Sequence, residues 1–119
     1  MLEMSIVEKP LEKVDVKSDY VQISVKDDLE LIVLAMMLKQ PMCGTEIIKT
    51  IHNKFGVLLS PGTIYPLLHS LEKKGLLRCK RSAKIKTYEP VEGSKKKISE
   101  MLEERVKAWG ILSQFLRER

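Results

Sequence analysis

The segment from Ser60 to Lys86 constrains the fold more than any other part of this chain. Ser60 followed by Pro61 is typical of a helix N-cap and first helical position. The apolar residues that follow recur at helical spacing, at Ile64, Leu67, Leu68 and Leu71. Seven cations and no acid come next, at Lys73, Lys74, Arg78, Lys80, Arg81, Lys84 and Lys86. This order predicts a helix with one apolar face, followed by a basic β-hairpin.

The hairpin is predicted from two short runs, residues 77–81 and 85–89, joined by residues 82–84. Two helices precede it. One opens at Asp27-Asp28, whose carboxylates suit a helix N-terminus, and stops at Gln40-Pro41. The other follows Gly44-Thr45 and ends near Gly56. From Ser94 a helix of about 24 residues would run ~36 Å, which exceeds the width of the core formed by the other helices. We therefore expect a mainly α winged helix-turn-helix fold with a long C-terminal helix.

The N-terminal 26 residues differ from the rest in pattern. Apolar and polar residues alternate at 14–16 and 21–25, which predicts a strand. We expect residues 1–26 to form an extension that is partly strand or mobile. Residues 27–92 would form the winged-helix DNA-binding domain, and residues 93–119 a dimerisation helix.

Charge favours a polyanionic partner. The net charge is +5, with four cations against five acids in residues 1–26, ten against seven in 27–92 and seven against four in 93–119. The two cysteines, Cys43 and Cys79, make neither a disulfide framework nor a zinc motif. No catalytic motif or phosphate loop is present, so we expect neither an enzyme nor a cofactor. No stretch reads as a signal peptide or a membrane span, which predicts a cytoplasmic protein.

The segment Ser60-Pro-Gly-Thr-Ile-Tyr-Pro-Leu-Leu-His-Ser-Leu-Glu-Lys-Lys-Gly-Leu-Leu77 resembles the PadR family of transcriptional regulators, which is marked by Gly-Thr-Leu-Tyr-Pro and Leu-Glu-x-x-Gly-Leu. Pro41-x-x-Gly44-x-Glu46-Ile47 is similar to the family's Pro-x-His-Gly-Tyr-Glu-Ile, and Tyr88 fits its Arg-x-Tyr-x-Leu-Thr segment. The chain departs from the pattern at Cys43, Thr45 and Pro90-Val91. The resemblance covers roughly residues 28–117 and implies a homodimeric DNA-binding regulator, more often a repressor.

Duplex DNA is the expected partner of the third helix and the hairpin. The predicted contacts are Ser60, Thr63, Tyr65, Pro66, His69, Lys73, Lys80, Arg81, Lys84 and Lys86. Several have a structural alternative. Ser60 also suits a helix cap, His69 also suits a solvated position, and Tyr65 could be a half-buried ring that packs on a neighbouring helix.

A second copy of the chain is the expected partner of the last helix. Its apolar residues step by three and four, at Ile98, Met101, Leu102, Val106, Trp109, Leu112, Phe115 and Leu116. By analogy with multidrug-sensing relatives, Trp109 could instead line a pocket between subunits that binds a small apolar effector.

The sequence thus favours a homodimeric repressor whose third helices enter successive major grooves ~34 Å apart on an inverted repeat. The alternative is a winged helix that docks proteins and does not bind DNA sequence-specifically.

Overall fold

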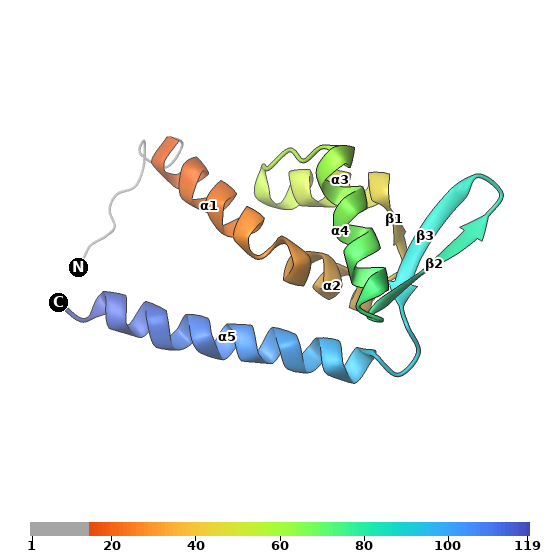
Figure 1. The fold of residues 1–119 in the computed structure, drawn as a ribbon. Coiled ribbons are helices and arrows are strands. Elements are labelled where there is room, and N and C mark those ends of the chain that lie inside the picture. Colours follow the sequence, from red (N-terminus) through yellow and green to blue (C-terminus); the bar gives the residue numbers. More distant parts are fainter. Residues whose placement is uncertain (1–14) are drawn as a thin grey trace.

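Five helices and a small sheet make up the computed structural model, which describes residues 15–119 (Figure 1). The elements, in chain order, are α1 (Asp15–Asp27), α2 (Leu29–Lys39), β1 (Met42–Cys43), α3 (Gly44–Phe55), α4 (Pro61–Lys73), β2 (Leu77–Ser82), β3 (Ile85–Pro90) and α5 (Lys95–Arg117). The predicted mainly helical winged fold with a long last helix is confirmed. The calls on residues 1–14 lie outside the described residues.

Local sequence signals set the ends of the central helices. Gln40 leaves α2 in an extended conformation immediately before Pro41. Gly56 caps α3 with a left-handed φ of 72°, and Gly75 follows α4 with a φ of 77°. Pro61 opens α4 after the extended Ser60. These boundaries agree with the sequence predictions.

The sheet has three antiparallel strands in the order β1-β3-β2. Strand β3 is central, and its Tyr88 lies opposite Met42 of β1 and Cys79 of β2. The hairpin β2–β3 was predicted, whereas β1 was not. Only two residues, between Pro41 and Gly44, form β1, and this is too short a run to show alternation.

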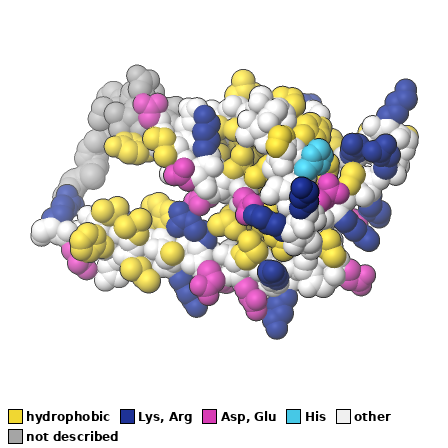
Figure 2. Space-filling model, viewed as in Figure 1, with side chains coloured by type: hydrophobic (Ala, Val, Ile, Leu, Met, Phe, Trp, Pro, Cys, Tyr) yellow, Lys and Arg dark blue, Asp and Glu magenta, His cyan; other side chains and the backbone are white. Residues whose placement is uncertain are grey.

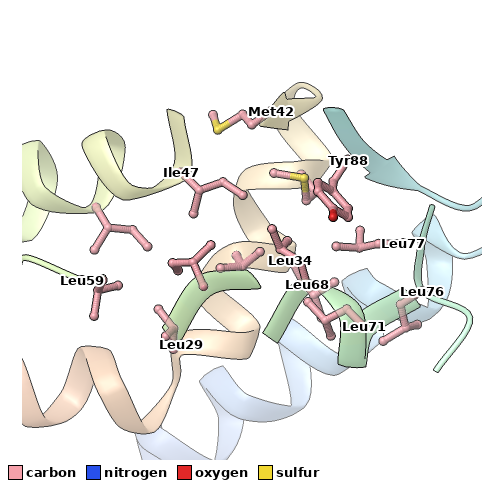
Figure 3. Packing of buried hydrophobic residues seen from close by; sticks show 14 of the residues in the cluster. Leu29, Leu34, Met42, Ile47, Leu59, Leu68, Leu71, Leu76, Leu77 and Tyr88 are labelled. Carbon is pink, nitrogen blue, oxygen red and sulfur yellow. The ribbon is translucent and has the colours of Figure 1, made fainter. Parts of the chain in front are cut away.

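One hydrophobic core joins the helices to the base of the wing (Figure 3). It includes the apolar face of α4 as predicted, with Ile64, Leu68 and Leu71 fully buried. Tyr88 enters the same core from the sheet and is 1% exposed. Burial raises the pKa of Tyr88 to about 12, with smaller contributions from Cys79, Glu72 and Tyr65. The wing is therefore anchored at its base by a large neutral side chain.

The strand predicted at residues 21–25 is wrong, because these residues lie in α1. A strand would place Val21, Ile23 and Val25 on one face, whereas a helix places Val21 and Val25 one turn apart and Ile23 elsewhere. Val25 is 3% exposed and Val21 packs against the core, while Ile23 is 54% exposed. Packing of α1 against α2 and α3 places Val21 and Val25 at the core, and this packing favours a helix over a strand.

The first half of α5 packs against α2. Ile98 is fully buried there, and Met101 and Leu102 pack against the core. The Arg105 guanidinium then donates two hydrogen bonds to the Asp28 carboxylate, both 2.9 Å long. This pairing raises the pKa of Arg105, and it engages the carboxylate that was expected to serve the N-terminus of α2. Beyond Arg105, α5 projects from the core (Figure 1).

Alkaline pH should weaken the fold through Tyr88. The pKa of a tyrosine is about 10 in an unfolded chain, but that of Tyr88 in the fold is about 12. The stability from its neutral form is thus complete below pH ~10 and is lost as the pH rises toward ~12. Between pH ~9 and ~11 this loss should be about 1.4 kcal/mol. Urea unfolding at both pH values should show a smaller decline in Tyr88→Phe and the full decline in the control Tyr20→Phe.

Candidate nucleic-acid interface

The outward face of α4 carries most of the residues predicted to touch DNA. Ser60, Thr63, Pro66, His69 and Lys73 are all exposed. The Ser60 and Thr63 hydroxyl oxygens lie 3.3 Å apart, within hydrogen-bond distance, at the start of the helix. Ser60 makes no side-chain cap bond, so its hydroxyl remains near the surface. The structure therefore leaves these five side chains exposed at the start and along the outer surface of α4.

The wing has an anchored base and an exposed tip. Leu77 and Cys79 share one face of β2 with Arg81, because side chains two residues apart point the same way. Leu77 is buried, Cys79 is half-buried and Arg81 is exposed, so this face leaves the core as the hairpin extends. The turn residue Ala83 has a φ of 56°, which is uncommon for a residue other than glycine.

The basic run from Lys73 to Lys86 contains no acid in the sequence, but the fold brings acids from other segments close to some of its cations. Glu89 of β3 lies opposite Arg78, whose Nη2 is 2.7 Å from Glu89 Oε2. Lys80 Nζ lies 3.9 Å from the same oxygen. Lys74 Nζ lies 2.8 Å from an oxygen of Glu30 in α2. Three of the seven cations thus have acidic neighbours. The pairing of Arg78 with Glu89 could have been found by writing out the hairpin register.

The remaining wing cations gather at the tip. Within residues 19–119, no ion pair within 4.0 Å is formed by Arg81, Lys84 or Lys86, which we call the wing-tip cations, or by Lys73 of α4. Arg81 and Lys86 lie directly opposite each other in the β-ladder. Like charges in this arrangement repel, so the tip carries an electrostatic strain that a polyanion would relieve. Figure 2 shows Lys and Arg side chains gathered around the wing.

A groove lies where β1, α3, α4 and the wing meet. It is lined by Cys43, Thr45, Tyr65, Lys84, Ile85 and Lys86. Tyr65 is half-buried within it, at the flank of α4 that faces the start of α3. In the sequence, Cys43 and Thr45 stood out only as departures from a family pattern. Their place beside the wing depends on tertiary packing, which no local pattern signals.

The predicted dimer residues before Arg105 are buried or half-buried, whereas those after it are exposed. Ile98 belongs to the chain's own core, so its predicted place in a dimer interface is wrong. Met101 and Leu102 are half-buried. The apolar residues beyond Arg105 are 48% to 74% exposed, at Val106, Trp109, Ile111, Leu112, Phe115 and Leu116. Ile111 was not among the predicted residues. These side chains cover the projecting half of α5 (Figure 2).

Two other site classes find no support within the described part of the chain. Residues 19–119 contain no group of three His, Cys, Asp or Glu side chains that could hold a metal ion. Over the same residues, no helix has the length and apolar character needed to cross a bilayer.

Comparison with known proteins identifies the family. The model of the transcriptional regulator PadR-like family matches residues 33–104, which is more than half of the chain. The chain belongs to the PadR-like family. The resemblance drawn from the Ser60–Leu77 motif is thus confirmed. The family is one of transcriptional regulators and not of enzymes, in agreement with the sequence prediction.

Solved structures share the PadR-like fold over most of the chain. A PadR family transcriptional regulator from Eggerthella lenta is 22% identical, covers 88% of this chain and 96% of its own, and has a TM-score of 0.71. A PadR-like transcriptional regulator from Bacillus cereus is 28% identical, covers 78% of this chain and 91% of its own, and has a TM-score of 0.62.

A curated relative matches a shorter region. The transcriptional activator GvpE of Haloferax mediterranei is 39% identical over 59 residues, which is 50% of this chain. The match spans 31% of the length of that relative.

The charge repulsion at the wing tip leads to a stability prediction. Lys86→Gln removes the cation opposite Arg81 and should raise the free energy of unfolding by ~0.2–1 kcal/mol at low salt. High salt should reduce the gain because exposed charges are screened. Urea unfolding at two salt concentrations measures both effects. Lys84→Gln is the matched control, since Lys84 lies in the turn and faces no strand partner. If Lys86→Gln and Lys84→Gln have the same free energy of unfolding at low salt, the proposed repulsion between Lys86 and Arg81 is contradicted.

Proposed function

We propose that this PadR-like chain is a DNA-binding transcriptional regulator that acts as a homodimer on an inverted-repeat operator. The observation that carries the proposal is the cationic wing tip beside the exposed face of α4. An α-helix fits the major groove of B-DNA, and cations beside it can neutralise the flanking phosphates. In this arrangement α4 reads bases and the wing-tip cations hold the backbone.

The two surfaces have different expected contributions. His69 and Thr63 lie on the exposed face of α4, where side chains can reach base edges or phosphates. The wing-tip cations would bind any sequence, because phosphates carry no sequence information. Selection of duplex fragments from a random pool by the purified protein tests the proposal directly. A shared motif with two half-sites supports it, whereas an unenriched pool favours the protein-docking alternative.

Salt dependence should separate the wing-tip cations from those that have acidic neighbours. Replacing Arg81, Lys84 and Lys86 with Ala removes six cations from a bound homodimer, so the slope of log affinity against log salt should fall by about 5, at ~0.9 per phosphate contact. The matched control replaces Lys74, Arg78 and Lys80, which lie near Glu30 or Glu89, and removes the same formal charge. Its slope should change less. Equal changes in both triple variants would show that net charge alone attracts DNA.

The homodimer would be formed by the projecting half of α5. Trp109, Leu112, Phe115 and Leu116 are each about half exposed or more, and burying one large apolar side chain contributes roughly 2 kcal/mol. A second copy of the helix offers the same stripe in return. Association through two-fold symmetry would then place two copies of α4 on one face of the duplex.

Sedimentation measures this association. The wild-type chain should be a dimer at micromolar concentration, and Trp109→Glu with Phe115→Glu should shift it to a monomer, because charges would be buried at the seam. Gln114→Glu adds an acid to an exposed position of the same helix and should leave the dimer intact. A wild-type monomer would overturn the dimer, the inverted-repeat operator and the effector pocket expected near Trp109.

The direction of regulation is a separate proposal. The family resemblance favours a repressor, whereas the curated relative is named a transcriptional activator. We retain repression, because a dimer bound across a promoter excludes polymerase without any further contact. A reporter gene placed behind the selected operator should fall in expression when the chain is supplied. An increase would assign activation.

A further inference from the structure

Gly44 is the first residue of α3, and its backbone does not require glycine. Its φ is not positive, unlike those of Gly56, Gly75 and Gly93. The first helical turn accepts most residues, and alanine is a better helix former than glycine. Conformational freedom therefore does not explain why glycine stands at this position.

Close approach of Tyr65 does explain it. A Cβ atom added to Gly44 would lie 2.5 Å from both Cζ and the hydroxyl oxygen of Tyr65, and 2.8 Å from Cε1. Carbon atoms that are not bonded to each other are normally ~3.5–4.0 Å apart. The phenol of α4 thus lies against the bare backbone at the start of α3, in space that any other side chain would occupy.

The same side chain also borders the wing. Tyr65 lines the groove that also contains Thr45 of α3 and Lys84 and Lys86 of the wing. It is also near enough to the buried Tyr88 of β3 to contribute to the raised pKa of that residue. Among the side-chain hydrogen bonds made within residues 19–119, none involves the Tyr65 hydroxyl. Its place is thus fixed by packing, at the point where α3, α4 and the wing meet.

We propose that Gly44 is a positioning residue for DNA binding, because its missing side chain seats the Tyr65 phenol against α3 and so fixes α3, α4 and the wing relative to one another. The inference rests on the proposed DNA-binding function. It also reconciles the two predicted roles of Tyr65, which are DNA binding and packing. A half-buried ring can position the neighbouring side chains that contact DNA.

Gly44→Ala tests the contact. The phenol is the end of a half-buried side chain, so the added methyl should push it toward the groove without unfolding the chain. If the overpacking is relieved by displacing α4 from its place beside the wing, we expect affinity for the selected operator to fall by about tenfold or more. Affinity for a random-sequence duplex should fall less, because the wing-tip cations are unchanged. A purely structural defect would lower both affinities equally.

Tyr65→Leu supplies the matched background. Leucine ends before the three atoms that approach Gly44, so Gly44→Ala in this background should change neither stability nor affinity further. The double-mutant cycle should therefore be strongly non-additive. Gly62→Ala is a control for stability, since its added Cβ would meet only Ser60 Oγ at 3.6 Å.

Three outcomes are distinct. Additive effects of the two substitutions on urea unfolding and operator affinity would overturn the Gly44–Tyr65 contact. Equal losses of operator and random-duplex affinity would overturn its positioning role. If the wild-type chain binds no DNA, the proposed function fails, and the positioning role fails with it. The stability cycle would still report on whether the contact itself exists.

Discussion

The burial of Tyr88 in the central strand is the constraint on which the DNA-facing half of the molecule depends. β3 is paired on both sides only at its middle, where Tyr88 and Thr87 face β1. The tip is held by β2 alone. Because the base of the wing packs in the same core as α4, that core joins the wing to the helix. A rigid base with a solvent-exposed tip is the arrangement that a backbone clamp beside a reading helix requires.

The cations near the core also differ from those at the wing tip. Cations near the core have acidic neighbours, as Lys74 has Glu30 and Arg78 has Glu89, so they add no unbalanced charge to the fold. At the tip, Arg81 and Lys86 face each other and no acid is in reach within the described residues. By the repulsion between like charges, this placement should lower the stability of the free protein by a small amount. In return, it concentrates positive potential where the proposed duplex would lie.

The residues that predicted the fold correctly were those with a strong local signal. Pro41, Gly56 and Pro61 marked helix ends, and the spacing of Ile64, Leu68 and Leu71 marked the buried face of α4. Residues 21–25 misled because Val, Ile and Val alternate at a period of two, while the packing surface of α2 and α3 selects the helical pair Val21 and Val25. The contact between Gly44 and Tyr65 joins residues 21 positions apart, and no local pattern encodes such an approach.

The pair formed by Arg105 and Asp28 determines what α5 can do. On the N-terminal side of this pair, Ile98 is buried and fixes the helix to α2. On the C-terminal side, the helix continues for 12 residues to Arg117 with its apolar side chains in solvent. These 12 residues rise ~18 Å. A dimer formed there would hold each α4 at a distance set by one rigid connection, and not by a flexible linker. Half-site spacing in the proposed operator would then follow directly from the packing of α5 on α2.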